Sequence, residues 1–213
     1  MIRLEGEISF MVDELMGEDY GILRWRGPFD ATFVFQLCAQ SESNFFCRVA
    51  YDENGRAVGA AVNNCVLRED WEVGLEEELG RVGESGYRPI QAIHHQLRQG
   101  NKHLFDEIIT DKLFDIGMIG VEVENRGQGI ATNLIRRSIL LAGCLGFRGI
   151  KTEATGRFSR AAFTTVGMQP AGAIDYANFE FEGTKPFEGM AGSDTQITFM
   201  KKKFFQSALK HIL

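Results

Sequence analysis

Hydrophobic positions recur with two different periods along the chain, one typical of helices and the other typical of strands. Residues 5–17 and 29–39 have helical spacing. Residues 46–51 and 57–67 are apolar runs joined by a short segment that contains Asn-Gly, a strong sequence signal for a hairpin turn. The first third of the chain therefore predicts two helices followed by a β-hairpin.

The rest of the chain alternates between helical and strand patterns. Residues 71–109 are charged and mostly helical in pattern, with a break near Gly83–Pro89. Residues 112–123 are apolar on both faces, as expected for a central strand. The remaining segments are expected to be a helix that starts near residue 130, a strand over 149–155, a helix over 159–166 and strands over 171–181 and 195–204. This order predicts one mixed α/β domain spanning residues 1–213.

The segment VEVENRGQGIATNLI, residues 121–135, joins the central strand to the next helix through a turn that contains two glycines. Gly146 is placed to end that helix, whose apolar stripe consists of Ala131, Leu134, Ile135, Leu141, Ala142 and Leu145. The first N–H groups of a helix lack partners inside the helix, and the helix dipole is positive there. Because glycines let a ligand approach the backbone closely, the turn is suited to a phosphate or pyrophosphate group.

Three kinds of phosphate loop compete for this turn, with an ordinary tight turn as the alternative to all of them. A P-loop would need a Lys after its last glycine, and none follows Gly129. A dinucleotide fingerprint would need a third glycine where Thr132 stands, and an acidic residue at the end of the next strand, which ends in Ala154-Thr155. The third pattern, Arg/Gln-x-x-Gly-x-Gly/Ala, matches residues 126–131, Arg-Gly-Gln-Gly-Ile-Ala.

That third pattern is the pyrophosphate loop of acetyl-CoA-dependent acetyltransferases, and the chain resembles their superfamily, the GNAT N-acetyltransferases. Residues 146–168 supply the strand and helix that follow the loop in that superfamily. Segments between Gly55 and Lys203 further resemble the invertebrate arylalkylamine (dopamine-type) N-acetyltransferases in order and spacing. The resemblance implies a central mixed, mostly antiparallel twisted sheet with helices on both faces, and acetyl-CoA as the cofactor.

Carried over residue by residue, the resemblance assigns cofactor binding to this loop and to the strand before it. The strand would pair with the pantetheine arm, and the N–H of Ile119 or Val121 would donate to the thioester carbonyl oxygen, with Gly120 allowing close approach. The expected cofactor-binding residues are Ile119, Gly120, Val121, Arg126, Gly127, Gln128, Gly129, Ile130, Ala131, Thr132, Ser159 and Phe163.

Acetyl transfer to an amine requires a group that removes a proton from the nitrogen, and a carboxylate can do this directly or through water. The resemblance places this base at Glu18, with the adjacent Asp19 as second choice; a solvated acidic helix end is the alternative. The resembled family carries two hydroxyl residues near the start of the helix over 159–166, and these map to Thr155 and Ser159, of which Ser159 would donate to the departing sulfur or orient a water. Ser159 is also suited to be the N-cap of the helix after it. The Tyr acid of many superfamily members is replaced by Phe163, which has no proton to give.

Several other positions bear on the chemistry of the site. The family often has a His where Gly117 stands, so a His-assisted proton relay on this strand is missing. Tyr176 is the expected amine-binding residue, because its segment matches the amine-side strand of the family. His94 and His95 lack the spacing of a metal site and are expected to be exposed on a helix, so no metal is expected. Residues 201–203, all Lys, are expected to form a solvated strand edge.

Composition narrows the class of partner. The 23 Lys and Arg residues and 29 Asp and Glu residues give a net charge of −6, which argues against nucleic-acid binding and suits a small cationic amine. The four cysteines have no CxxC spacing and are expected to be reduced thiols. No segment has the pattern of a signal peptide or a membrane span, so a cytoplasmic monomer or weak dimer without a membrane partner is expected.

The expected activity is acetyl transfer from acetyl-CoA to a small primary amine by direct attack in a ternary complex. The expected acceptor is an arylalkylamine such as dopamine, serotonin or tryptamine. A polyamine, agmatine, thialysine or a protein lysine is the rival class of acceptor. A second rival is an acyl-CoA-binding module without transferase activity, since the Asp-Glu-Pro-Leu-like motif, the strand His and the Tyr acid of the family are all absent.

Overall fold

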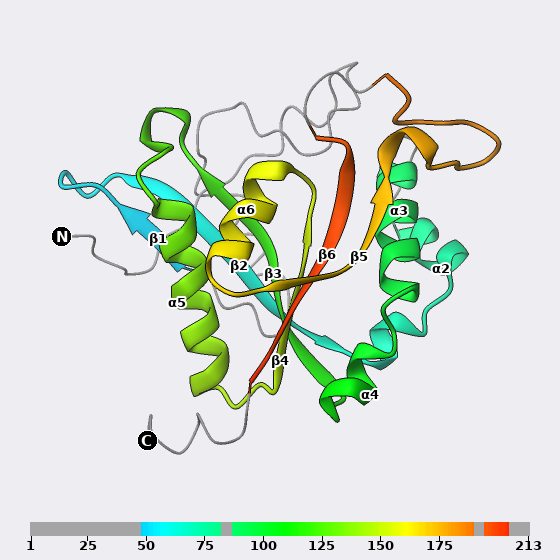
Figure 1. Ribbon diagram of the computed structural model, residues 1–213, viewed down its shortest axis with the longest axis horizontal. Helices are drawn as coiled ribbons and strands as arrows, with labels where there is room; N and C mark the ends of the chain where they lie inside the picture. The colour runs from blue at the N-terminus through cyan, green and yellow to red at the C-terminus, as the bar shows by residue number, and fades with distance from the viewer. Residues whose placement is uncertain (1–47, 82–86, 190–193, 205–213) are drawn as a thin grey trace.

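The computed structural model (Figure 1) describes three stretches of the 213-residue chain, which are residues 48–81, 87–189 and 194–204. The helices expected over residues 5–17 and 29–39, and the candidate bases Glu18 and Asp19, lie outside these stretches. No helix within the three stretches is both long enough and apolar enough to cross a membrane.

Six strands form one mixed sheet in the order β1-β2-β3-β4-β6-β5 (Figure 1). The strands are β1 (Arg48–Tyr51), β2 (Ala57–Leu67), β3 (Lys112–Val121), β4 (Gly149–Ala154), β5 (Gln169–Asp175) and β6 (Gln196–Lys203). All neighbouring strands are antiparallel except β3 and β4, which run parallel. The expected mixed, mostly antiparallel sheet is therefore confirmed.

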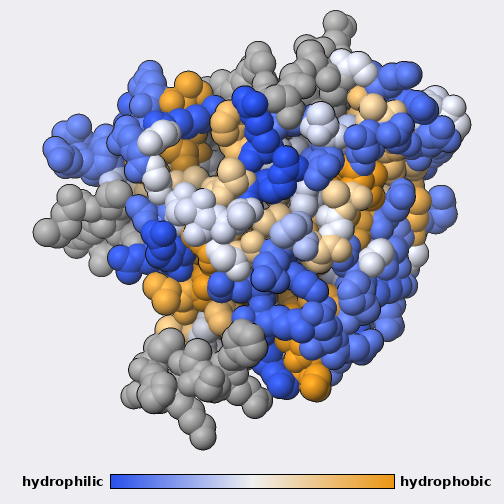
Figure 2. Space-filling model, in the orientation of Figure 1, coloured by the Kyte–Doolittle hydropathy of each residue, from blue (hydrophilic) through white to orange (hydrophobic). Residues whose placement is uncertain are grey.

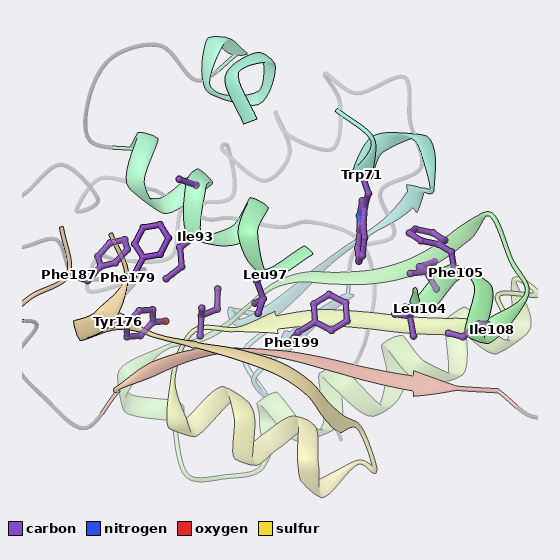
Figure 3. Packing of buried hydrophobic residues seen from close by; sticks show 13 residues of the cluster. Trp71, Ile93, Leu97, Leu104, Phe105, Ile108, Tyr176, Phe179, Phe187 and Phe199 are labelled. Carbon is purple, nitrogen blue, oxygen red and sulfur yellow. The ribbon is translucent and has the colours of Figure 1, made fainter. Parts of the chain in front are cut away.

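Helices cover both faces of this sheet, as expected (Figures 1 and 3). One face packs against α5 (Ile130–Cys144) and α6 (Arg157–Thr165), and the other against α3 (Arg88–Gln99) and α4 (Leu104–Ile108), while α2 (Leu75–Arg81) packs on α3. Successive side chains of a strand point to opposite faces. Coverage on both sides is therefore the reason that Leu113 and Phe114, neighbours on β3, are both fully buried.

The face covered by α3 has an aromatic core (Figure 3). Trp71 ends the short 3-10 helix η1 (Glu69–Trp71) and meets Phe105 and Phe199 edge-on, with ring centroids 5.0 and 5.8 Å apart. Each edge-to-face pair adds about 0.5–1.5 kcal/mol beyond the burial of its area. These contacts join η1, α4 and β6, which are far apart in the sequence.

The hairpin between β1 and β2 forms as the Asn-Gly signal predicts. The Asp52 carboxylate accepts hydrogen bonds from the backbone N–H groups of Asn54 and Arg56, both at 2.9 Å. Gly55 adopts a left-handed φ of 79°, which residues with a Cβ rarely adopt.

Helix α5 ends at the expected glycine. Gly146 has a φ of 75°, and the N–H of Phe147 donates to the carbonyl oxygen of Ala142 at 3.0 Å, which satisfies the last turn. The expected buried stripe is correct in its middle, but Leu145 is 41% exposed. Ser138, which is not part of the expected stripe, is buried. A residue that follows the last turn no longer keeps the helical period, so Leu145 turns away from the sheet.

Three expectations about element bounds and edges are wrong. Helix α6 begins at Arg157 rather than residue 159. The strand expected over residues 171–181 ends at Asp175, and a 3-10 turn, η4 (Tyr176–Asn178), follows it. The segment of residues 201–203 lies on β6, an inner strand, so it is not a sheet edge.

The inner position of β6 gives its lysines partners. Lys201 lies 2.6 Å from the Glu107 carboxylate of α4, and Lys203 pairs with the same carboxylate. Hydrogen bonds from these two lysines lower the pKa of Glu107 to about 2. The segment therefore ties α4 to the sheet.

Candidate active site

The candidate anion-binding loop runs from the end of β3 through a 3-10 turn, η3 (Val123–Asn125), into α5. Gly127 and Gly129 have left-handed φ values of 76° and 78°, and Gly129 is the N-cap of α5. A Cβ placed on either glycine would have no atom within 4 Å, so the space above the loop is open. The loop is therefore shaped by glycine conformation and exposed to a ligand.

The backbone donors of this loop are available. In the part of the chain that the structure describes, the N–H groups from Gly127 to Thr132 have no hydrogen-bond acceptor; the first with a partner is that of Asn133, which donates to Gly129 O at 3.0 Å. α5 is 15 residues long, and its dipole adds positive potential at this end. A row of free donors at the start of a long helix is suited to a phosphate or pyrophosphate.

Two arginines fix the loop to the neighbouring strands. Arg126 donates from Nε to the carbonyl oxygen of Val121 at 3.0 Å, across the turn. Arg56, which directly precedes β2, donates from one guanidinium nitrogen to both carboxylate oxygens of Glu122 at 2.8 and 2.9 Å. The exposed Arg126 side chain thus also has a structural contact besides the expected cofactor contact.

Close packing under the loop depends on Gly59, which the sequence analysis did not identify. A Cβ at this position on β2 would lie 3.1 Å from the carbonyl oxygen of Gly120 and 3.1 Å from Ile130 Cγ2. The absence of a side chain lets the first turn of α5 rest directly on β2 and β3. The signal was the glycine inside a strand pattern, which often marks such close approach.

The seam between β3 and β4 opens next to this loop. The two strands pair only at Phe114 and Asp115 of β3, with Ile150 and Lys151 of β4. Beyond these pairs a side chain bridges the strands, since Thr152 donates from Oγ1 to the carbonyl oxygen of Ile116 at 2.7 Å. β3 and β4 are therefore paired at one end, and their other ends have no backbone pairing with each other.

A β-bulge changes the direction of β3 at the same point. Ile116 is opposite Asn63 and Met118 is opposite Val62, so Gly117 is an extra residue on β3. Both Gly117 and Met118 are exposed, although they belong to an inner strand. Bulges are common next to active sites because they redirect a strand. The expected pantetheine-binding residues Ile119, Gly120 and Val121 follow this bulge directly.

Ser159 has a different local role from the one expected. Gly156 is the N-cap of α6, and Ser159 is the third helical residue. Its hydroxyl accepts a hydrogen bond from the Gly156 N–H at 3.3 Å and donates to the Gly156 carbonyl oxygen at 2.9 Å. The expectation that Ser159 is the N-cap is therefore wrong, because the helix starts two residues earlier.

The true partner of the α6 N-terminus is Asp194, which the sequence analysis missed. Its Oδ1 accepts from the Arg157 N–H at 2.7 Å. Asp194 lies 37 residues further along the chain, so no local pattern could have indicated the contact.

Tyr176 and Phe163 are both core residues. The Tyr176 ring is 2% exposed and meets Phe187 edge-on at 5.8 Å (Figure 3), and its hydroxyl donates to the carbonyl oxygen of Thr155 at 2.8 Å. Burial raises the pKa of this hydroxyl. Phe163, also 2% exposed, packs with Phe114 on the opposite face. The ligand-binding roles expected for Tyr176 and Phe163 remain predictions, and the Tyr176 bond fixes the backbone at Thr155.

A buried charged cluster lies on the α3 side of the open seam. Lys151 on β4 lies 3.1 Å from Asp115 on β3 and 2.8 Å from Glu153. Glu153 also contacts Nδ1 of His94, which comes from α3. Asn64, with its amide nitrogen facing the carboxylate, donates to Asp115 at 3.0 Å. His94 is therefore not the exposed helix residue that was expected.

The charges in this cluster shift one another's pKa values. Burial alone would raise the pKa of Glu153, but the Lys151 ammonium and the His94 imidazole hold it below its usual range. Burial would lower the pKa of Lys151, yet Asp115 and Glu153 raise it. For Asp115, burial is the larger influence and raises its pKa. Glu153 is consequently a carboxylate and Lys151 a cation at neutral pH.

His95 is also less exposed than expected. Its Nδ1 lies 3.3 Å from the Glu78 carboxylate of α2, a distance that permits attraction without the alignment of a hydrogen bond. Arg98 pairs with the same carboxylate at 2.6 Å. Among the described residues, no group of three or more His, Cys, Asp or Glu side chains could hold a metal ion.

Comparison with known proteins identifies this arrangement of strands and helices. No protein-family model matches the sequence. Arylalkylamine N-acetyltransferase 2 from Aedes aegypti is 21% identical, with 95% of this chain and 98% of that chain covered and a TM-score of 0.74. A mosquito arylalkylamine N-acetyltransferase-like protein, 5b, is 19% identical, with 96% and 100% covered and a TM-score of 0.72.

A third solved structure has a different acceptor in its description. The polyamine N-acetyltransferase of Drosophila melanogaster, described as forming N-acetylagmatine, is 15% identical, with 84% of this chain and 83% of that chain covered and a TM-score of 0.69. At such low identities the shared property is the fold. The chain therefore has the fold of the GNAT N-acetyltransferases.

Proposed function

We propose that the protein is an acetyl-CoA-dependent N-acetyltransferase that acts on a small primary amine, with an arylalkylamine as the expected acceptor. The observation that carries this proposal is the row of backbone N–H groups from Gly127 to Thr132, which have no partner among the described residues and lie at the start of α5 beside an open strand seam. Neither feature alone indicates a transferase. Together they provide a place for a pyrophosphate and a neighbouring channel for an extended arm.

The residues present fit coenzyme A. The free N–H groups of the loop would bind its pyrophosphate, and the left-handed Gly127 and Gly129 leave the approach open. Beyond the bulge at Gly117, the backbone of β3 has no pairing with β4, so Ile119 and Val121 are placed to bind an extended arm. When bound, acetyl-CoA supplies an acetyl group activated as a thioester.

The chain itself must polarise the acetyl carbonyl and manage two protons. An N–H of Ile119 or Val121 would donate to the carbonyl oxygen, the usual way in which a backbone stabilises developing negative charge. The resemblance assigns removal of the amine proton to Glu18 or Asp19. Ser159 would help the departing thiolate through its hydroxyl, with Thr155 beside it.

Direct attack by the amine is favoured over an acyl-enzyme. Of the cysteines in the described stretches, Cys144 is at the far end of α5 from the loop, and Cys65 is on β2. Burial raises the pKa of the Cys65 thiol, which makes the reactive thiolate scarcer at neutral pH.

Calorimetry and a thiol-release assay test the proposal. We expect acetyl-CoA to bind and NAD, which has a pyrophosphate but no pantetheine arm, to bind far more weakly. Turnover is then measured with arylalkylamines, polyamines, agmatine and a lysine peptide as acceptors. Fastest turnover with arylalkylamines supports the expected class of acceptor. Faster turnover with agmatine or polyamines would instead assign the rival class of acceptor. Binding without turnover for any amine would leave only a binding module, and no binding would overturn the proposal.

The proposal also covers the location, oligomeric state and partners of the protein. Its acidic composition favours an enzyme with no nucleic-acid partner, and we expect a cytoplasmic monomer or weak dimer. Sedimentation over a range of concentrations measures the oligomeric state.

A further inference from the structure

We propose that His94, held by Glu153, accepts the proton that the amine loses during acetyl transfer. This inference rests on the proposed function and assigns the base within it to α3 instead of the segment that contains Glu18. The supporting observations are the position of the pair at the open seam, the state of its carboxylate and the arrangement of charges around it.

The pair lies where an acceptor amine would meet the acetyl group. Glu153 is two residues past Lys151, the last residue of β4 that pairs with β3, so it stands beside the opening. Lys151 and Glu153 are on the same face of β4, and their mutual contact and that of Glu153 with α3 place them on the face opposite α5. An arm that follows the loop enters from the α5 side. The His94–Glu153 pair is on the other side, from which an amine would approach.

The hydrogen bond determines which imidazole nitrogen can act as a base. Glu153 is a carboxylate and can only accept, so Nδ1 of a neutral His94 must carry the proton and donate it. Nε2 then has a lone pair, and within the described residues it has no hydrogen-bond partner. A carboxylate on Nδ1 and a free Nε2 form the arrangement in which histidine acts as a general base, because the carboxylate stabilises the imidazolium that results.

Charged groups from four elements lie around the His94–Glu153 pair. On β4 and β3, the Lys151 cation is matched by Asp115 as well as Glu153. On α3 and α2, the Arg98 cation is matched by Glu78, which His95 also approaches. Glu153 is thus the carboxylate in direct contact with His94, and Lys151 and Arg98 each pair with a carboxylate of their own surroundings.

Acetyl transfer to the amine forms one bond and breaks one. The lone pair of the amine nitrogen forms the new N–C bond with the acetyl carbon, and the C–S bond breaks with its electron pair remaining on sulfur. The proton leaves the nitrogen for Nε2 of His94. It then passes to water, and the departing sulfur takes a proton from water, either directly or through the Ser159 hydroxyl, which regains its proton from water.

The test compares His94→Asn with His95→Asn. The Asn amide can still donate to Glu153 from the position of Nδ1, but it provides no base at the position of Nε2. We expect His94→Asn to bind acetyl-CoA as the wild type does and to lose about 100-fold in kcat/KM near neutral pH. Because an aliphatic amine has a pKa near 10, its free fraction rises about tenfold per pH unit, and the variant's rate should rise with it. His95→Asn should stay within about threefold of the wild type.

The outcomes separate the inference from the proposed function. An active wild type with an unaffected His94→Asn variant, or one slowed by the same factor at every pH, would assign His94 a structural role and overturn the inference alone. If only Glu18→Gln lowered kcat/KM, the inference alone would likewise be overturned. A wild type that neither binds acetyl-CoA nor turns over would overturn the proposed function, and the inference with it.

A second variant covers the case in which His94→Asn does not fold. Glu153→Gln keeps an acceptor for Nδ1 but removes the charge that stabilises the protonated imidazole. The acid limb of the pH–rate profile should then move to lower pH, since protonating His94 becomes harder. An acid limb that stays in place would contradict the assignment.

Discussion

Gly127 and Gly129 show how single residues determine the candidate cofactor loop. Each adopts a left-handed conformation that costs a residue with a Cβ about 1–2 kcal/mol. Sequence could indicate these residues because their conformation is set by the local turn. It could not indicate the contact between His94 and Glu153, which lie 59 residues apart and are brought together only when α3 packs on the sheet.

Gly129→Ala should weaken acetyl-CoA binding at least tenfold, measured by calorimetry. The added Cβ strains the N-cap of α5 and tilts the N–H groups that would bind the pyrophosphate. Gly55→Ala is the matched control, because Gly55 has a similar φ of 79° and equally open surroundings, but lies in the β1–β2 hairpin. Both variants should lose similar stability, and only Gly129→Ala should lose affinity. Equal affinities would show that the loop does not hold the ligand.

The elements differ in how far the sequence predicted them. The hairpin and α5 were predicted nearly to the residue, since turn chemistry and helical period are local properties. The inner position of β6 was not, because strand order depends on pairing between distant segments. The same is true of the start of α6, where Asp194 supplies the capping carboxylate from the other end of a long connection.

Packing between α4 and β4 allows an element-scale prediction. A Cβ on Gly149 would lie 2.3 Å from Cδ1 of the buried Ile108 and 3.2 Å from Leu113 Cδ2. Gly149→Ala should therefore lower the free energy of unfolding by about 1–3 kcal/mol, as overpacking does. Replacing Ile108 with Val in the same chain should restore part of the loss. Denaturant unfolding measures both.

The control is the same substitution in the last turn of a helix. At Gly143 of α5 the nearest atom to an added Cβ, Phe204 Cε1, is 3.9 Å away. Gly143→Ala should raise stability by about 0.5–1 kcal/mol, because alanine loses less backbone entropy in a helix than glycine. Destabilisation by Gly143→Ala, or none by Gly149→Ala, would contradict this account of the packing.

At the scale of the whole molecule, the mixed α/β class and the coverage of both sheet faces followed from the alternating pattern and the resemblance. The buried charged cluster did not follow from either, because Lys151 and Glu153 look like the solvated face of a short strand. The visible surface is largely hydrophilic, with isolated hydrophobic side chains between polar ones (Figure 2). Single exposed hydrophobic residues of this kind are normal for a folded protein.

The short seam between β3 and β4 has a consequence for how the molecule responds to a ligand. In the described stretches, Phe114 and Asp115 of β3 and Ile150 and Lys151 of β4 make the only strand pairing between the β1-β2-β3 half and the β4-β6-β5 half. A ligand bound in the gap between β3 and β4 would contact both halves and hold them together. Acetyl-CoA should therefore slow amide hydrogen exchange in residues 117–121 and raise the melting temperature, so that occupancy can be followed before any acceptor amine is known.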